Sequence, residues 1–257
     1  MDAVKTETNS TILDYRIYVN ENFEKYDYDQ WLFEQLNLTP GLSVLDLGCG
    51  TGKHLFKFPE IVGENGNIVG VDISEESLTK CRRKIEELGV SNITVYKSDL
   101  TRITETVPHK FDRILSSFAI YYTQDEHKTF NDCYALLNKN GSLFVCGPAN
   151  GTNAEFLELV RRAGGTFSNE FIQWSRFLED TAIPLLKKIF GNLELITFEN
   201  PIEFPNEEIL FNYWKATPLY NPALEDAMSK IINDEFGKNG VFVNKKIVLG
   251  LRCTRYE

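Results

Sequence analysis

The chain has 257 residues, of which 42% are apolar, and it carries a formal net charge of -10. This length and composition allow one large α/β domain, or a domain with a cap. The acidic balance argues against a nucleic-acid partner, because binding a phosphate backbone depends on clustered Lys and Arg. The basic pairs are scattered and are interpreted as solvated faces of helices or strands: Arg82-Arg83, Arg161-Arg162, Lys187-Lys188 and Lys245-Lys246.

The cysteines and the hydropathy pattern indicate the compartment. There are five cysteines, an odd number, and none forms a C-x-x-C pair. Neither a disulfide framework nor a metal site is therefore predicted, and a reducing cytoplasm is expected. No apolar run approaches the length of a membrane-spanning helix, and the N-terminus has no apolar leader, so no membrane partner is expected.

The stretch from position 11 to position 38 is rich in aromatic residues. Its second half has helical spacing, which predicts that Trp31, Leu32 and Leu36 pack on a sheet. Upstream of that pattern two interpretations of the tyrosines stay open, namely core packing and closure over a ligand. Tyr18 is our candidate for contact with a substrate.

A buried strand followed by a glycine turn is predicted between Ser43 and His54, where the sequence reads S-V-L-D-L-G-C-G-T-G-K-H. The three alternating glycines allow a sharp turn and let a ligand lie against backbone amides. A helix expected from Lys53 to Phe58 would point its N-terminal amides at the same ligand. The dinucleotide fingerprint fails here because Lys53 replaces its third glycine, and the P-loop fails at both of the positions held by Leu47 and His54.

The remaining pattern, D-L-G-C-G-T-G, resembles the first motif of the class I S-adenosylmethionine-dependent methyltransferases. The resemblance implies S-adenosylmethionine as cofactor, with S-adenosylhomocysteine as product. It also implies an adenine-binding acid and a neighbouring apolar residue after the third strand. Together, the resemblance and the positions at strand ends give these predicted cofactor-binding residues: Asp46, Gly48, Cys49, Gly50, Asp72, Ile73, Asp99, Leu100 and Ser116.

Asp72 has an independent argument from spacing. It ends a second apolar strand, predicted over 68–72, and lies 22 positions after Gly50 (72 − 50). In nucleotide-binding folds an acid about 20 residues after the glycines binds the ribose hydroxyls. An ionised carboxylate only accepts hydrogen bonds, so it suits a diol that donates twice. Ser74 already offers the N-cap of the following helix, which leaves Asp72 free for this role.

Helices and strands go on alternating as far as position 148, with strands expected over 92–96, 111–116 and 142–146. This alternation predicts a doubly wound, mainly parallel sheet with the ligand at the carboxyl ends of the strands. Tyr121 follows the fourth strand, near the expected methyl group, and is the catalytic candidate, with Tyr122 as a substrate contact. Because tyrosine has a pKa near 10, Tyr121 suits a donor or orienting group better than a base. His54 and His127 are weaker candidates for the base.

From about position 153 to position 190 the sequence pattern predicts helices and is rich in aromatic residues. Trp174 and Phe177 are candidates for lining a substrate pocket there. A helix with Thr123 and Glu126 as its capping box is expected before this region. After it come a strand over 193–203, helices over 206–215 and 222–236, and a last strand over 241–253 that the resemblance places antiparallel.

The expected architecture is therefore an α/β, Rossmann-like, seven-stranded sheet with an antiparallel last strand and a helical cap insertion. The domain division is an aromatic N-terminal arm at 1–40, a cofactor-binding core at 41–150, a helical cap at 151–191 and completion of the sheet at 192–257. The expected function is methyl transfer to an oxygen or nitrogen of a small organic acceptor, driven mainly by alignment of the reacting atoms. Two rivals stay open: a nicotinamide-dependent oxidoreductase and a non-catalytic binder of the same cofactor.

Overall fold

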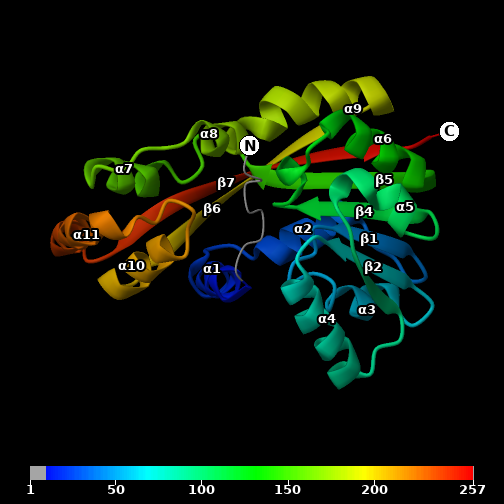
Figure 1. Ribbon diagram of the computed structural model, residues 1–257, viewed down its shortest axis with the longest axis horizontal. Helices are drawn as coiled ribbons and strands as arrows, with labels where there is room; N and C mark the ends of the chain where they lie inside the picture. The colour runs from blue at the N-terminus through cyan, green and yellow to red at the C-terminus, as the bar shows by residue number, and fades with distance from the viewer. Residues whose placement is uncertain (1–9, 257) are drawn as a thin grey trace.

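A computed structural model describes residues 10–256 of the chain. Seven strands form one sheet in the order β3-β2-β1-β4-β5-β7-β6. The first five are parallel, and β7 runs antiparallel between β5 and β6 (Figure 1). The strands are β1 (Ser43–Leu47), β2 (Asn67–Asp72), β3 (Ile93–Lys97), β4 (Phe111–Ser117), β5 (Leu137–Pro148), β6 (Glu194–Phe204) and β7 (Phe242–Thr254). The predicted Rossmann-like, mainly parallel sheet with an antiparallel last strand is confirmed.

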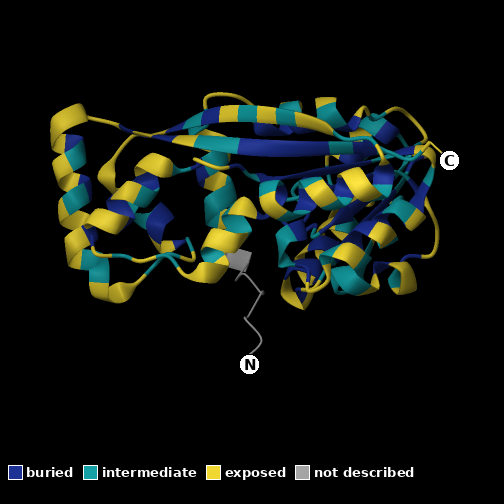
Figure 2. Cartoon of the chain, turned by 90° about the horizontal axis from the view of Figure 1, so that it is seen from above, coloured by how far each residue is buried: buried dark blue, intermediate teal, exposed yellow. Residues whose placement is uncertain are grey.

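Helices cover both faces of this sheet. Alternation along β1 sends Val44 to one face and Leu45 to the other, because successive side chains of a strand point in opposite directions. One face packs against α2 (Tyr28–Leu36), α3 (Phe58–Val62) and α4 (Glu75–Leu88). The other packs against α5 (Ile103–Thr106), α6 (Glu126–Leu136) and α9 (Ile183–Phe190). Figure 2 shows the buried residues concentrated on the strands and on the helix faces turned toward them.

A second hydrophobic core forms where β6 and β7 run beyond the other strands. It is built by the far ends of these two strands with α7 (Ala154–Arg162), α10 (Glu207–Lys215) and α11 (Glu225–Asn239), and we call it the distal unit. Its centre is Trp214, which is fully buried. The rest of the sheet and its covering helices form the sheet unit. Helix α1 (Ser10–Phe23) lies between the two units and contributes Val19 to the distal core (Figure 1).

The predicted cap range divides between these two cores. Helix α7 packs in the distal unit, whereas α9 and the π-helical turn η3 (Leu178–Ala182) pack on the sheet. Helix α8 (Asn169–Phe177) connects them. The four-part domain division stays a prediction. Within the described residues, no helix has both the length and the apolar character needed to cross a lipid bilayer.

Two local predictions were wrong. The expected helix over 53–58 is a series of turns, and the helix that follows is α3, because Pro59 has no N–H to donate to an earlier turn of a longer helix. The capping box is also wrong, since Asp125 is the N-cap of α6 and accepts a hydrogen bond from the backbone N of Lys128. The hydroxyl of Thr123 bonds instead to that of Thr129, at 2.6 Å.

Candidate active site

The glycine turn joins β1 tightly to β2. Gly48, Gly50 and Gly52 have φ values of 75°, 55° and 87°, a region that L-residues with side chains disfavour. A Cβ atom on Gly48 would lie 2.2 Å from the Cβ of Ala119. The backbone N of Gly48 donates to the carbonyl of Val71 at 2.7 Å. The turn is therefore shaped by the backbone and has no room for a side chain at its first glycine.

Asp72 lies against this turn. Its Oδ2 accepts a hydrogen bond from the backbone N of Gly50 at 2.8 Å, and its Oδ1 accepts one from Ser74 at 2.9 Å. The carboxylate at the end of β2 is thus held beside the glycines, as the spacing argument requires. Ile73, the next residue, is 38% exposed at the same edge.

Asp46 is buried directly before the turn. Its Oδ2 has no hydrogen-bond partner among the described residues. Burial raises the pKa of Asp46 to about 6, helped by the negative charge of Asp72 and opposed by His54. A buried carboxylate oxygen without a partner is costly, so this position is one where a bound donor or cation would be stabilised.

The loop after β3 adjoins Asp72, since the backbone N of Ser98 donates to the Asp72 carbonyl at 3.0 Å. Asp99 caps the short helix η1 (Leu100–Arg102), and its Oδ1 accepts two bonds from Thr101, both of 2.7 Å. Leu100 is half-buried at the start of η1. The loop thus brings Asp99 and Leu100 to the same edge of the sheet as Asp72.

Two of the predicted cofactor contacts point into the protein. Ser116 is fully buried, and its hydroxyl donates to the carbonyl of Leu47 at 3.1 Å, which ties β4 to β1. The thiol of Cys49 packs beneath the turn, where a Cβ on Gly70 would lie 2.9 Å from its sulfur. Their roles toward a cofactor stay predictions.

Aromatic side chains gather beyond the end of β4. The rings of Tyr121 and Tyr122 are 4.7 Å apart, and Trp174 packs edge-on against Tyr122 at 5.3 Å. Burial raises the pKa of both tyrosines, and for each the positive charge of Arg16 opposes the rise. Both phenols are therefore protonated at neutral pH and can donate hydrogen bonds.

The other two substrate candidates lie elsewhere. Phe177 is buried in the core of the sheet unit, and Tyr18 is 48% exposed on α1, where its ring neighbours are Tyr15 and Phe23. Neither histidine candidate for the base is close to the tyrosines by its described contacts. Nε2 of His54 lies 3.3 Å from Asp29, and His127 is exposed on α6.

Two cations at the junction of the units were missed from the sequence. Lys246 was interpreted as a solvated residue, but it is half-buried on β7, and its Nζ lies 4.9 Å from the centroid of the Phe118 ring. Phe118 follows β4 directly and has a φ of 53°. Arg16 on α1 has a buried Nε without a hydrogen-bond partner among the described residues. Strand alternation was the available indication, because it places Lys245 and Lys246 on opposite faces of β7.

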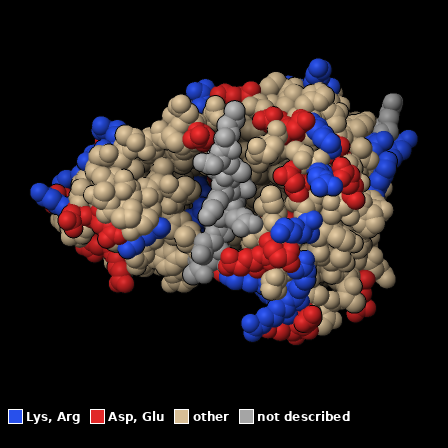
Figure 3. All heavy atoms as spheres, viewed as in Figure 1, with Lys and Arg blue, Asp and Glu red and all other residues tan. Residues whose placement is uncertain are grey.

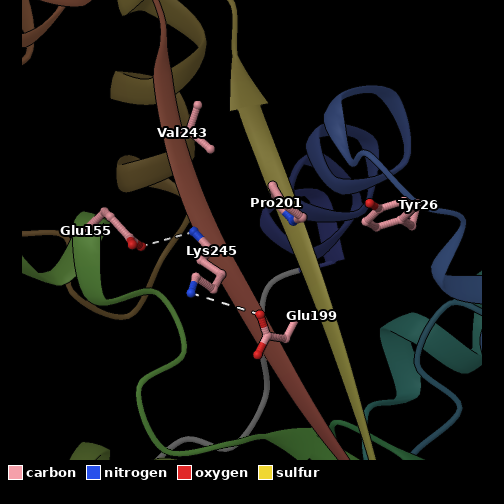
Figure 4. Close-up of a pocket in the computed structure, with 6 residues that line it drawn as sticks. All are labelled: Tyr26, Glu155, Glu199, Pro201, Val243 and Lys245. Atoms are coloured by element: carbon pink, nitrogen blue, oxygen red, sulfur yellow. Dashed lines mark hydrogen bonds and ion pairs between the residues drawn. The ribbon is translucent and has the colours of Figure 1, made fainter.

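A groove of about 500 Å³ lies on the other face of the β6–β7 ribbon and is not part of this site. Figure 4 shows Lys245 between Glu155 and Glu199 in this groove. The backbone N of Lys245 donates to Glu155 at 3.0 Å, and its Nζ lies 3.9 Å from Glu199. In the space-filling view, acidic and basic side chains are intermingled on the visible face (Figure 3).

Comparison with known proteins gives a consistent picture. A family model described as a methyltransferase domain matches residues 38–179. A probable cobalt-precorrin-6B C(15)-methyltransferase (decarboxylating) of Saccharolobus solfataricus is 30% identical over 130 residues, which are 50% of this chain and 60% of that protein. A ubiquinone/menaquinone biosynthesis C-methyltransferase of Escherichia coli is 34% identical over 105 residues, 41% of this chain and 42% of that protein.

Among solved structures, phosphoethanolamine N-methyltransferase 2 of Haemonchus contortus in complex with S-adenosyl-L-methionine superposes with a TM-score of 0.60 at 15% identity. The match covers 97% of this chain and 58% of that one, and it shows a shared fold. The chain spans at most 60% of the length of the curated relatives named above.

Proposed function

We propose a function from the premise that this chain belongs to the class I S-adenosylmethionine-dependent methyltransferase family. The function is transfer of a methyl group from S-adenosylmethionine to an oxygen or nitrogen atom of a small organic acceptor. The observation that carries the proposal is the contact between the Gly50 backbone N and Asp72, at 2.8 Å, at the carboxyl ends of the parallel strands.

The residues at this edge fit the cofactor. We expect Asp72 to bind the ribose hydroxyls, and Asp99 with Leu100 to bind the adenine. The unpartnered Oδ2 of Asp46 fits the positively charged part of the molecule. When bound, S-adenosylmethionine supplies a methyl group activated on a cationic sulfur. The protein then has to align the acceptor with that group and exclude water, and alignment can supply about 7 to 11 kcal/mol of barrier reduction.

The protonated hydroxyl groups of Tyr121 and Tyr122 favour an oxygen or nitrogen atom as the methyl acceptor. Such an atom brings its own lone pair, whereas carbon first has to be activated by proton removal. Tyr121 and Tyr122 are protonated at neutral pH because burial raises the pKa of each, so they orient an acceptor better than they deprotonate it. The two curated relatives are named as C-methyltransferases and the solved neighbour as an N-methyltransferase, so carbon is the alternative that an assay has to test.

A small molecule fits the surroundings better than a nucleic acid does. The chain has a net charge of -10, and the region next to the glycine turn is lined by aromatic rings, among them Tyr122 and Trp174. The five cysteines are free, which suits a reducing cytoplasm.

The test is calorimetric titration with S-adenosylhomocysteine and with NAD. Wild-type protein is expected to bind the first and not the second. Asp72→Ala should weaken binding by about 1 to 3 kcal/mol through lost charge-assisted hydrogen bonds. Asp226→Ala, which removes an exposed acid from the first turn of α11, is the matched control and should leave affinity unchanged.

Binding of NAD instead would support the oxidoreductase and contradict the proposal. A panel of alcohols, amines and activated carbon acids, assayed for S-adenosylhomocysteine production, then separates turnover from simple binding. Production with the carbon acids alone would contradict the oxygen or nitrogen assignment.

A further inference from the structure

Two cations at the junction between the sheet unit and the distal unit lack an anionic partner. Within residues 10–256, Arg16 and Lys246 make no ion pair, and the Nε of Arg16 is buried without a hydrogen bond. The described contact of Lys246 is with the face of the Phe118 ring, at 4.9 Å from its centroid. A cation–π contact with Phe replaces only part of the hydration that a lysine loses on burial.

These cations lie close enough to act on each other and on the neighbouring phenols. Burial lowers the pKa of Lys246 to about 8, and the positive charges of Lys53 and Arg16 add to this effect. The charge of Arg16 also opposes the burial-driven rise in the pKa of Tyr122, on the short helix η2 (Ile120–Tyr122), and of Tyr213 on α10. Because α1 packs against α10 and β6, Arg16 is an electrostatic neighbour of Lys246 and of these tyrosines at the junction.

One acid, Glu24, acts on Lys246 without forming an ion pair with it. The negative charge of Glu24 opposes the lowering of the Lys246 pKa, but its two oxygens accept hydrogen bonds from the backbone N of Tyr28 and from Nδ2 of Asn200, both at 3.1 Å. Lys53, the other cation nearby, is paired with Asp29 at 3.0 Å. Holding two like charges together in a partly desolvated place costs free energy unless a counter-ion joins them.

We propose that the methyl acceptor carries an anionic oxyacid group, a phosphate or a carboxylate, that binds between Arg16 and Lys246. The inference rests on the proposed function and adds the class of acceptor to it. The planar guanidinium of Arg16 can donate two parallel hydrogen bonds to such a group, and Lys246 adds a point charge. Phenol hydroxyls of Tyr122 and Tyr213 are available as neutral donors. An acceptor anchored there by its anion extends its nucleophilic end toward Tyr121 and the glycine turn.

The experiment titrates inorganic phosphate and, separately, acetate into the full chain at constant ionic strength, with and without S-adenosylhomocysteine. Wild-type protein is expected to bind at least one of the two anions at millimolar concentration. Arg16→Gln and Lys246→Met should each weaken that binding by about tenfold or more, because each variant loses one hydrogen bond from a charged donor. Lys245→Met is the matched control, because Lys245 lies on the opposite face of β7 and faces the groove of Figure 4, so anion binding should be unchanged.

Thermal unfolding supplies a second readout. In the absence of anions, Lys246→Met should unfold at the same or a higher temperature than wild type, since it removes a desolvated charge without a counter-ion. Added phosphate should stabilise the wild type and not this variant. Tighter binding of phosphate than of acetate assigns the acceptor to phosphate esters, and the reverse order assigns it to carboxylic acids.

The inference is overturned if neither anion binds the wild type, or if Lys246→Met and Lys245→Met bind equally well. Failure of the proposed function is seen separately, as an absence of S-adenosylhomocysteine binding in the same samples. Because the anion titration is also done without that ligand, the cationic pair is tested in either case.

Discussion

The sheet unit and the distal unit differ in the charges that meet between them. At the ends of β1, β2 and β3 the sheet unit presents acids, Asp46, Asp72 and Asp99, around a turn made of glycines. At the junction with the distal unit, Arg16 and Lys246 present cations among tyrosines. A cationic methyl donor suits the first set, and an anionic acceptor suits the second. If both proposals hold, the chain recognises two ligands of opposite charge by using different parts of its sequence.

The hydrophobic cores of the two units are also separate. A substitution at the centre of the distal core tests this separation and has the largest expected effect on stability. Trp214 is fully buried at the centre of the distal unit, and its Nε1 donates to the carbonyl of Leu219 at 3.2 Å. Trp214→Ala should lower the free energy of unfolding by about 3 to 5 kcal/mol. At a temperature where the variant is folded, its affinity for S-adenosylhomocysteine should stay within about threefold of wild type, a change of about 0.7 kcal/mol or less in binding free energy.

The matched variant for that experiment is Phe58→Ala, which removes a fully buried ring below the glycine turn. It should lose similar stability and also lose affinity for S-adenosylhomocysteine. Equal losses of affinity in the two variants, measured by calorimetry, would show that the units do not act separately.

A smaller effect is expected from closing the glycine turn. Gly48→Ala places a methyl group 2.2 Å from the Cβ of Ala119 at a φ of 75°. We expect a loss of about 2 to 4 kcal/mol in the free energy of unfolding, together with weaker cofactor binding. Gly89→Ala, at a φ of 63° with nothing within 4 Å, isolates the backbone cost of about 1 to 2 kcal/mol. If both variants are equally destabilised in urea titrations, the close contact with Ala119 is not what requires glycine.

The smallest effect concerns the acid before the turn. Burial raises the pKa of Asp46 to about 6, so folding favours its protonated form. The stability that this group provides is present below its unfolded pKa of about 4 and is lost as the pH rises through about 6. Asp46→Asn should therefore stabilise the protein without ligand at pH 7 by about 1 to 3 kcal/mol and flatten the change in stability between about pH 4 and pH 6.

That variant should also bind S-adenosylhomocysteine more weakly, because the carboxylate charge is gone. Urea unfolding over the pH series and calorimetry at pH 7 measure the two effects. A variant that is less stable than wild type at pH 7 would show that the charge of Asp46 is already compensated in the folded protein.

The helices and strands of both units were largely predictable from the sequence, but the packing of the distal unit into a separate core was not. Alternating apolar strands and helices, with Asp72 and the glycines at strand ends, are local patterns that fix a parallel sheet and its ligand edge. Arg16 and Lys246 are 230 positions apart (246 − 16), and only the packing of α1 against β6 and α10 brings them together. The helix predicted over 53–58 does not form for a local reason, because Pro59 has no backbone N–H to donate to an earlier turn.

The ribbon formed by β6 and β7 constrains how an acceptor can enter. Eleven consecutive residue pairs join these strands from Glu194 to Phe204, and the ribbon runs unbroken through both units. A paired ribbon resists bending far more than a single connecting segment, so wide opening of one unit against the other would strain many backbone hydrogen bonds at once. Helix α1 is held to the turn by fewer bonds, among them that of Thr51 to Asp14 at 3.3 Å. A displacement of this one helix would therefore break fewer hydrogen bonds than a hinge movement between the two units.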